Sequence, residues 1–529
     1  MPIMESVDAV LIYPSSGESG KATFSPPHSL LSIAAPLVDD FNVKIIDQRV
    51  DPNWKGKLKS YLNTQPAAVA FSAMTGLQIR YALETAKYIM EEADNTIPLV
   101  WGGVHASMLT DQTMDNEYVD IIVKGEGDIS FKEIIKRRKE GKSINDINGI
   151  SFKEYGKKIH NPEARLLNLN DIGDIPWELI NVEDYITNGD LMFEPGTVKR
   201  MLDIGVTSKG CPHKCSFCYN LFFNKMYWRG MSAEKTFERF KQIVDDFKVD
   251  GIWVHDDNYF VDLKRVENIA DMMIDNKMDV QWTSSGITVF TYAKMPDELK
   301  DKVVKSGCSS FRFGVESASP RILQMIDKPN TAEQVYEVNK DAIKHNVSPI
   351  YSFMIGFPTE TKEEILETCK MVVKLKKENP KCKTHGISVY TPYPGTPLYE
   401  LACENGFTPP KTFEEWSNIY WGSKDVEISL CKVEREFLDN VQDISYLNSD
   451  WFNYIIPRWL RILSKPARMW LNYRWNNQMF NASFELDIYR KMRRYMYNRN
   501  SDRKNKDEKN ESDDKSKGIK IKPLLAASG

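Results

Sequence analysis

The chain has 529 residues, 42% of them hydrophobic and 27% charged, with a formal net charge of -4 at pH 7. This composition is that of a globular protein with two to four domains, and it excludes a wholly disordered or fibrous chain. No apolar run is long enough to span a membrane, and the N-terminal residues lack the features of a secretory signal, so we expect a cytoplasmic protein. Its eight cysteines do not indicate a disulfide framework in that compartment.

Strand-like apolar runs alternate with helical patterns through the first 140 residues. We expect strands at 7–13, 43–47, 67–72, 98–102 and 119–124, each followed by a helix. This alternation predicts an α/β domain with a doubly wound, Rossmann-like parallel sheet over residues 1–140. Ligands of such sheets bind beyond the carboxyl ends of the strands. In this chain those ends carry turn residues that include Ser72, Ala73, Gly102, Gly103, His105, Gly125 and Glu126.

A second α/β unit follows a polar segment without clear periodicity at 141–195, which we expect to be a linker or small subdomain. Over residues 196–405 the expected strands are 201–206, 251–255, 280–285, 310–315, 350–355 and 386–390, and helices such as 233–247 and 362–377 separate them. Six such units predict a partial or full (β/α)6 parallel barrel. Chemistry in barrels occurs at the carboxyl ends of the strands.

The C-terminal region, residues 406–500, differs from the rest in charge. Residues 451–500 contain ten Lys or Arg, two acids and twelve aromatic residues, so this stretch is +8 while the remainder of the chain is -12. Interleaved basic and aromatic residues are typical of helices at an anionic lipid surface. The alternatives are an aromatic core layer with solvated arginines and a nucleic-acid interface, and we expect no nucleic-acid partner because no known binding motif accompanies the pattern. The polar residues 501–529 are expected to be a disordered tail.

Three cysteines follow the first barrel strand within eight residues. Cys211, Cys215 and Cys218 have CxxxCxxC spacing in an expected loop. Three thiolates can hold three irons of a [4Fe-4S] cluster and leave the fourth iron open for a substrate or cofactor. The alternative is a zinc site completed by His213 or a distant cysteine, although structural zinc prefers paired CxxC knuckles and four closed ligands.

On these motifs, residues 201–400 resemble the radical S-adenosylmethionine (SAM) superfamily. The resemblance implies that the three cysteines bind the cluster, that the open iron chelates SAM, and that reduction cleaves SAM to a 5'-deoxyadenosyl radical. By resemblance, Phe217 lies beside the adenine. The Gly314-Val315-Glu316-Ser317 run places Glu316 and Ser317 at the amino group and ribose of SAM, although Ser317 could instead cap a helix. The segment from Phe353 to Thr361, with Ile355 and Gly356, resembles the family's adenine-flanking motif, whereas Ser284-Ser285-Gly286-Ile287 departs from relatives that carry an arginine there.

Residues 5–140 resemble the cobalamin-binding domain that precedes the barrel in one radical SAM class. The resemblance rests on the segments from Pro26 to Ala35, from Gly102 to His105 and from Gly125 to Asp128. Small residues at the strand ends let a planar corrin lie close to the backbone. The DxHxxG motif that supplies a cobalt ligand is absent, because Asp47-Gln48-Arg49 occupies its place, so the resemblance implies cobalamin without a protein histidine ligand. The alternative is a degenerate domain that only packs on the barrel.

The layout is similar to that of lipid-modifying members of this class, the archaeal tetraether (GDGT) ring synthases and the hopanoid C-methylases. Our first hypothesis is radical modification of an isoprenoid membrane lipid, with cyclopentane ring formation preferred, at the inner face of the membrane. The second is a cobalamin-dependent C-methyltransferase acting on a hydrophobic or natural-product substrate, and the third is a non-catalytic iron-sulfur or cobalamin carrier. The enzyme hypotheses imply a ferredoxin or flavodoxin as electron donor. His255-Asp256-Asp257-Asn258 is a candidate for positioning substrate or for proton transfer, or else a capped turn.

Overall fold

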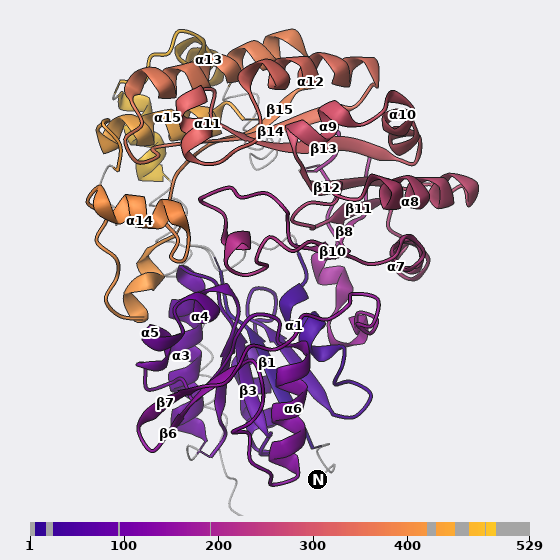
Figure 1. Ribbon diagram of the computed structural model, residues 1–529, viewed down its shortest axis with the longest axis vertical. Helices are drawn as coiled ribbons and strands as arrows, with labels where there is room; N and C mark the ends of the chain where they lie inside the picture. The colour runs from indigo at the N-terminus through magenta and orange to yellow at the C-terminus, as the bar shows by residue number, and fades with distance from the viewer. Residues whose placement is uncertain are drawn as a thin grey trace, which may run out of the picture.

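The computed structural model describes residues 6–16, 25–93, 96–190, 192–420, 430–449, 465–481 and 483–492. Two α/β domains lie one above the other in Figure 1, with the N-terminal domain at the bottom and the second domain at the top. The two predicted α/β units are thereby confirmed, and a loop of the second domain lies between them.

The first domain is a sheet with helices on both faces. Its strand order is β2-β1-β3-β4-β5-β6-β7, in which β1 to β5 are parallel and β6 and β7 are antiparallel. The strands are β1 (Ala9–Tyr13), β2 (Val43–Asp47), β3 (Ala68–Ser72), β4 (Leu99–Gly102), β5 (Ile121–Val123), β6 (Ile150–Glu154) and β7 (Lys157–His160). The helices are α1 (His28–Ala34), α2 (Trp54–Leu62), α3 (Leu77–Glu92), α4 (Val104–Met108), α5 (Thr110–Met114) and α6 (Asp128–Lys139). The parallel strands are almost entirely buried, which explains their continuous apolar runs.

The segment 141–195, expected to be a linker or a small subdomain, contains secondary structure. Its first part forms the β6–β7 hairpin, which extends the first sheet at the β5 edge. β7 is an edge strand with exposed and half-buried side chains, so it lacks the apolar alternation by which a strand is recognised. The later part contains two short 3-10 helices, η1 (Trp177–Leu179) and η2 (Val182–Tyr185).

The second domain is a partial parallel barrel. Within the described residues its strands run in the order β8-β11-β12-β13-β14-β15, all parallel. They are β8 (Met201–Asp203), β11 (Gly251–Val254), β12 (Gln281–Ile287), β13 (Cys308–Glu316), β14 (Ser348–Ile355) and β15 (Lys383–Val389), with a small antiparallel pair β9 (Ser208–Lys209) and β10 (Arg229–Gly230). The helices are α7 (Ala233–Phe247), α8 (Leu263–Asp275), α9 (Val289–Lys294), α10 (Asp297–Lys305), α11 (Pro320–Met325), α12 (Ala332–Lys344) and α13 (Lys362–Glu378).

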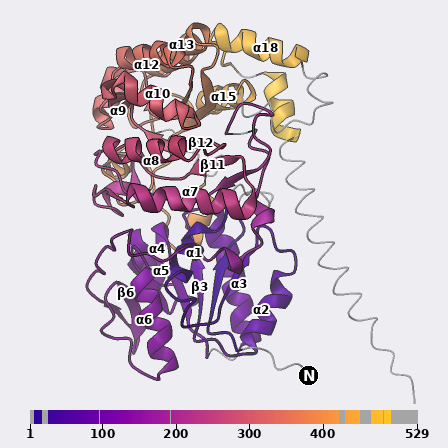
Figure 2. The same ribbon diagram turned by 90° about the vertical axis from the view of Figure 1, so that its right-hand side faces the viewer.

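The barrel helices cover the outside of the strands. Figure 2 shows α7, α8, α10 and α12 one above another along one side of the molecule. Helix α7 has the predicted bounds because its apolar side chains recur on one face and Ser232 caps its first turn. The aromatic residues Phe311 and Phe313 of β13 pack against Tyr292 of α9, so the odd-numbered residues of this part of β13 face the helices. The alternating residues therefore face the interior of the barrel.

The described C-terminal elements are α14 (Pro397–Glu404), η4 (Glu414–Asn418), α15 (Arg435–Leu447) and α18 (Lys465–Asn476). Helix α15 packs on β15, while Phe413, Trp416 and Ile419 enter the core of the first domain. Much of the basic, aromatic stretch and all of the expected tail, residues 450–464 and 493–529, lie outside the described residues. No helix in the part of the chain that the structure describes combines the length and apolar character needed to cross a bilayer.

Candidate active site

The three clustered cysteines lie in the loop between β9 and the short 3-10 helix η3 (Tyr219–Leu221), at the carboxyl side of the first barrel strand. This loop lies between the two domains in Figure 1. Among the residues that the structure describes, no compact group of ligand atoms of the kind that surrounds a single zinc ion includes these cysteines.

Burial makes these thiols dependent on a metal for ionisation. It raises the pKa of the Cys215 thiol and raises the pKa of the Cys218 thiol to about 11. Thiolates are the ligand form, so a bound cation is needed to displace both protons near neutral pH. The cysteine loop is thus suited to hold a metal cluster and unsuited to act as a free nucleophile.

The turn after β11 holds the cysteine loop in place. Asp256 is fully buried and accepts hydrogen bonds from the backbone N of Thr207 at 2.5 Å and from the hydroxyl of Ser208 at 2.6 Å. Asp257 accepts one hydrogen bond from each side of the cysteines, from Gly210 N at 2.9 Å and Tyr219 Oη at 2.6 Å. Within the candidate segment from His255 to Asn258, the two aspartates therefore hold the cysteine loop and the residues before it, and a role in substrate positioning or proton transfer stays a prediction.

Asn258 makes the direct contact between this turn and a cysteine. Its Nδ2 donates to Cys211 Sγ at 3.6 Å. Hydrogen bonds to cluster sulfurs are one of the means by which proteins set the reduction potential of iron–sulfur centres. Asn258 is thus suited to influence the cluster as well as the loop.

A buried ion pair lies beside the cysteine loop at the end of β13. Glu316 has a positive φ of 69°, and its Oε1 is 3.0 Å from Nζ of Lys328. The same ammonium lies 5.8 Å from the ring centroid of Phe217, which also contacts Phe357. The structure thus brings Glu316 and Phe217, two of the predicted SAM contacts, to one place next to Cys215.

The other predicted SAM residues have structural roles of their own. Ser317 is buried, accepts from Ser319 N at 3.1 Å and lies 3.3 Å from the hydroxyl of Thr368, so it stabilises the turn toward α11. Ile355 is buried at the end of β14, and Gly356 follows it with φ of 80°. Their contacts with SAM remain predictions.

Glu360 closes the turn that contains Gly356. Its Oε2 accepts from Gly356 N at 2.6 Å and Phe357 N at 3.1 Å, while Oε1 is buried without a partner. Burial raises the pKa of Glu360 to about 8. The turn is therefore held by a carboxyl group that favours its neutral form more than an exposed glutamate does.

Small residues form the carboxyl edge of the first sheet, as a corrin requires. Gly103 has φ of 96°, and a Cβ there would lie 2.7 Å from the carbonyl oxygen of Ala73. Gly125 also has positive φ and has open space where a side chain would be. Ser72 and Gly102 complete this edge as paired residues of β3 and β4. The residues present fit a flat cofactor lying close to the backbone, and their individual contacts remain predictions.

His105 has a packed environment instead of an open one. Its ring is enclosed by Phe413 and Trp416, with centroids 5.4 and 5.6 Å away, and its Nδ1 lies 2.8 Å from Thr75 Oγ1. Burial lowers the pKa of His105 to about 4, so its imidazole is neutral. This arrangement accounts for His105 as a core residue, and its contact with cobalamin stays a prediction.

The turn where a cobalt-ligating histidine would stand is satisfied by its own residues. Gln48 accepts from Ser15 N at 3.1 Å and donates to Thr85 Oγ1 at 2.7 Å, and Arg49 pairs with Asp47 at 2.6 Å. Tyr185 also donates to Asp47, at 2.9 Å. The structure thus fits cobalamin held without a histidine from this turn.

Two sets of polar contacts join the domains at this edge. Glu126 pairs with Arg229 at 2.5 Å and lies 3.5 Å from Lys209, and its contact with cobalamin stays a prediction. Asp203, at the end of β8, contacts His28 of the first domain at 3.1 Å and His255 of the barrel at 2.9 Å. Although burial opposes it, the two histidines hold the pKa of the Asp203 carboxyl well below its usual range.

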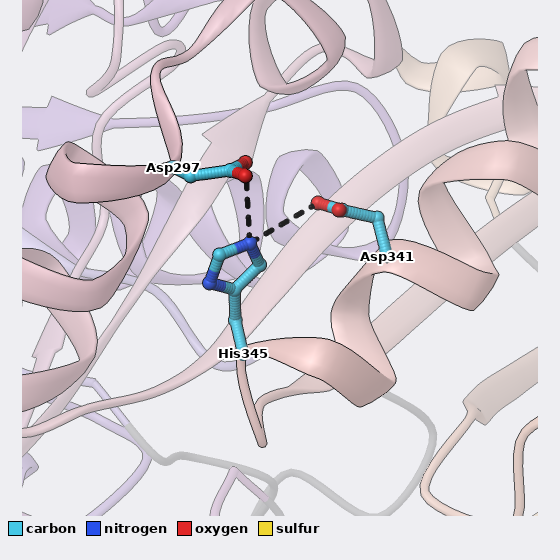
Figure 3. A group of neighbouring side chains, drawn as sticks. All are labelled: Asp297, Asp341 and His345. Carbon is cyan, nitrogen blue, oxygen red and sulfur yellow. Dashed lines mark ion pairs between the residues drawn. The ribbon is translucent and has the colours of Figure 1, made fainter.

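One other group of ligand-type side chains lies on the outer helices. Asp297, Asp341 and His345 point toward one another in Figure 3. Lys300 Nζ lies 2.7 Å from Asp341 Oδ2 and 3.4 Å from Asp297 Oδ1, so an ammonium already stands where a cation would bind. Lys344 also pairs with Asp297. This group is an ion-pair network between α10 and α12.

A parallel partial barrel with three cysteines at one strand end lies against a Rossmann-like domain edged with small residues, an arrangement suited to an iron–sulfur cluster and a second, flat cofactor. Residues 206–372 match the Radical SAM superfamily and residues 22–135 match the B12 binding domain. An uncharacterized methyltransferase of Pyrococcus horikoshii is 30% identical over 425 residues, which are 79% of this chain and 87% of that protein. The hopanoid C-3 methylase of Methylococcus capsulatus is 22% identical over 371 residues, 67% of this chain and 64% of that one.

Solved structures show the same fold. TsrM from Kitasatospora setae, with tryptophan substrate and a SAM analog bound, has a TM-score of 0.61 and 14% identity, covering 76% of this chain and 77% of that one. OxsB with aqua-cobalamin and SAM bound has a TM-score of 0.60 and 16% identity, covering 87% of this chain and 61% of that one. The chain belongs to the radical SAM superfamily, in the class whose barrel follows a cobalamin-binding domain. It is an enzyme whose cofactors are a [4Fe-4S] cluster, SAM and cobalamin.

Lys328 is the site residue that the sequence analysis missed. It follows α11, outside every motif quoted for the family, and only the return of this helix toward β13 brings its ammonium to Glu316. A lysine two residues before an asparagine and beside a proline carries no signal of its own. Asp203 was likewise not singled out, because its partners come from both domains.

Proposed function

We propose that this protein is a cobalamin-dependent radical SAM C-methyltransferase that acts on a hydrophobic substrate. The observation that carries the proposal is that the carboxyl edges of both sheets face each other where the two domains meet. Met108 of α4 and Phe222, which follows η3, both lie against Gly395 in the last barrel loop. Bound cobalamin would supply methyl transfer there, and the cluster with SAM would supply hydrogen abstraction from unactivated carbon.

Apolar side chains where the two domains meet support a hydrophobic substrate. Phe222 is 42% exposed, Met74 after β3 is 55% exposed and Tyr393 before Gly395 is 36% exposed. Large apolar side chains that stay exposed beside a site typically mark a surface that binds an apolar partner. In this proposal they bind the substrate and exclude water from it.

Two relatives support methyl transfer in preference to ring formation in a tetraether lipid. Two proteins similar to this chain over most of its length are named for methyl transfer, the Pyrococcus protein and the hopanoid methylase. The second hypothesis from the sequence is therefore preferred to the first. The alkyl substrate and a ferredoxin or flavodoxin as electron donor stay predictions.

An anaerobic incubation tests the proposal. The reconstituted protein is mixed with reductant, SAM and a total membrane-lipid extract, and nucleosides and lipids are analysed by mass spectrometry. Methyl transfer predicts both S-adenosylhomocysteine and 5'-deoxyadenosine, with a lipid that gains one methylene. Deoxyadenosine alone with a lipid that has lost two hydrogens supports ring formation instead, and neither nucleoside from a cluster-loaded sample supports a carrier.

We also propose that the C-terminal region contacts a membrane surface. Residues 484–492 are helical, and Phe484, Ile488 and Met492 are exposed on one face of that helix. Trp470 and Tyr473 of α18 are exposed as well, beside basic residues of the same region. An apolar stripe with basic neighbours is typical of a helix in the interface of anionic lipid.

Vesicle co-sedimentation tests the membrane contact. Wild-type protein should pellet with vesicles that contain anionic lipid, and a Phe484→Ser, Ile488→Ser double variant should lose most of this binding. Tyr155→Ser is the matched control, because Tyr155 is 98% exposed in the β6–β7 turn of the first domain. Equal pelleting of all three proteins would contradict the proposal and leave the aromatic residues as a packing layer.

A further inference from the structure

Arg312 stands in the middle of β13 and faces the barrel interior. Its neighbours Phe311 and Phe313 face the outer helices, so alternation turns Arg312 to the opposite side. Its Nη1 lies 3.0 Å from Nε2 of His385 on β15, although β14 lies between these two strands. This contact shows that both side chains lie on the same face of the sheet, which the alternation of β13 identifies as the inner one.

The guanidinium of Arg312 has no anionic partner. It donates to His385 Nε2 and, at 2.8 Å, to the sulfur of Met192, while its Nε is buried without a partner. In the part of the chain that the structure describes, no carboxylate forms an ion pair with it. The Arg312 side chain is partly buried, and a charge that loses water without gaining a counter-ion is costly, so its presence here calls for a ligand that offsets the cost.

The protonation states of the pair support this interpretation. Burial lowers the pKa of Arg312 to about 10, which leaves it charged at neutral pH. Burial, and then the nearby charge of Arg312, lowers the pKa of His385 to about 3. An uncharged His385 can accept from Arg312 at Nε2, so it orients the guanidinium without neutralising it.

The barrel interior beside Arg312 is lined by residues of β13 and β14. Ser352 of β14 is an exposed residue on the same face. Gly314 is its register partner on β13, and Glu316 Oε1 and Lys328 Nζ occupy the place where a side chain of Gly314 would lie. A group that enters from the cofactor side would therefore meet Arg312 next to Ser352 and beyond the Glu316–Lys328 pair.

We propose that Arg312 binds a carboxylate or phosphate group of the methyl-accepting substrate, with His385 as a positioning residue. A guanidinium suits such a group because it offers two parallel N–H donors to two oxygens. The assignment to the substrate rests on the proposed methyltransferase function. Together with the apolar side chains where the two domains meet, it defines the substrate class as an amphiphile with an anionic group.

Calorimetric titration of the reconstituted full-length protein with inorganic phosphate and with acetate tests the site without turnover. Wild-type protein should bind at least one of the two anions saturably, and Arg312→Met should weaken that affinity at least about tenfold, the value of one charge-assisted hydrogen-bonded contact. Arg312→Lys should keep part of the affinity because it keeps the charge. Arg321→Met is the control, since Arg321 is a half-exposed arginine that already pairs with Glu364.

The Tm with and without phosphate distinguishes loss of anion binding from a folding defect in the variant. Phosphate should raise the Tm of wild-type protein and of Arg321→Met, but not that of Arg312→Met. Anion binding that is equal in wild type and Arg312→Met, or absent from both, would overturn the inference. So would competition between phosphate and saturating SAM, because the anion bound by Arg312 would then be the carboxylate of SAM.

The two proposals fail separately. Anion binding that depends on Arg312, in a protein that yields no S-adenosylhomocysteine with any lipid extract, contradicts the methyltransferase proposal and supports an anion site. If the protein transfers methyl groups but Arg312→Met binds anions as tightly as wild type, only the inference about Arg312 is contradicted.

Discussion

Glu126 of the cobalamin-binding domain and Arg229 of the barrel form a buried ion pair, with 2.5 Å between Oε1 and Nη2. Both side chains are less than one tenth exposed. Although burial opposes it, the hydrogen bond from Arg229 and the charge of Lys209 lower the pKa of Glu126 below its ordinary value. This pair fixes the edge of the first sheet against the β9–β10 ribbon that leads into the cysteine loop.

Glu126→Gln should destabilise the protein by about 3 kcal/mol, because it leaves a buried guanidinium without its counter-charge. Urea denaturation followed by fluorescence measures the change. Glu163→Gln is the matched control, since the Glu163–Lys225 pair reaches the same cysteine loop but is exposed, and it should cost less than about 1 kcal/mol. Equal midpoints for the two variants would show that the buried pair does not hold the domains together.

Cys215→Ser should abolish cluster binding, because the remaining two thiolates cannot hold the cubane. The iron content and visible absorption of anaerobically reconstituted protein measure the loss, and SAM cleavage should disappear with it. Cys403→Ser is the control, since this half-buried cysteine of α14 belongs to none of the predicted ligands. Normal SAM cleavage by Cys215→Ser would show that Cys215 is not a cluster ligand.

Asn258→Ala should shift the midpoint potential of the cluster to a more negative value. The reason is that the variant removes the donor to Cys211 Sγ, and with it the stabilisation of the reduced, more negative cluster. Redox titration followed by electron paramagnetic resonance measures the potential. Asn276→Ala, at the end of α8, provides a control that should leave the potential unchanged. An unshifted potential in Asn258→Ala would restrict Asn258 to holding the loop.

Glu360 should make stability fall with rising pH. Its pKa is about 8 in the folded protein and 4.5 as a free side chain, so the folded state binds the proton more tightly. Stability contributed by the neutral carboxyl is complete below about pH 4.5 and is lost as the pH rises through about 8.

Glu360→Gln keeps an oxygen acceptor for Gly356 N and Phe357 N but cannot ionise. It should therefore be more stable than wild type at about pH 9, on the order of 2 kcal/mol, and nearly equal to it at about pH 5. Chemical denaturation at the two pH values measures the difference. A variant that is equally destabilised at both values would mean that the carboxylate is needed for the turn.

The elements that could be predicted are those whose local sequence pattern is sufficient to define them. Strand β2 has the predicted bounds because its apolar run is bounded by turn residues, and α7 because Ser232 and an apolar face define it. The cysteine spacing likewise carries its chemistry within eight residues. These predictions needed no knowledge of distant contacts.

Other features depend on contacts that no local pattern contains. The β6–β7 hairpin was not predicted because its outer strand is polar and takes its place only by pairing with the first sheet. The surroundings of His105 come from Phe413 and Trp416, far along the chain. Lys328 meets its partner Glu316 only in the folded barrel. Arg312 is notable because its Nε has no hydrogen-bond partner there, which the sequence does not show.

The packing of Phe413, Trp416 and Ile419 into the first domain has a consequence for biosynthesis. Trp416 donates to Gln112, 304 residues earlier, and Arg80 donates to Asn418, 338 residues later. The N-terminal core therefore stays incomplete on the ribosome until nearly the whole barrel has been translated. In the nascent chain, the apolar surface around Trp101 and His105 is therefore uncovered during that interval. A chain truncated before residue 413 would leave this surface uncovered permanently.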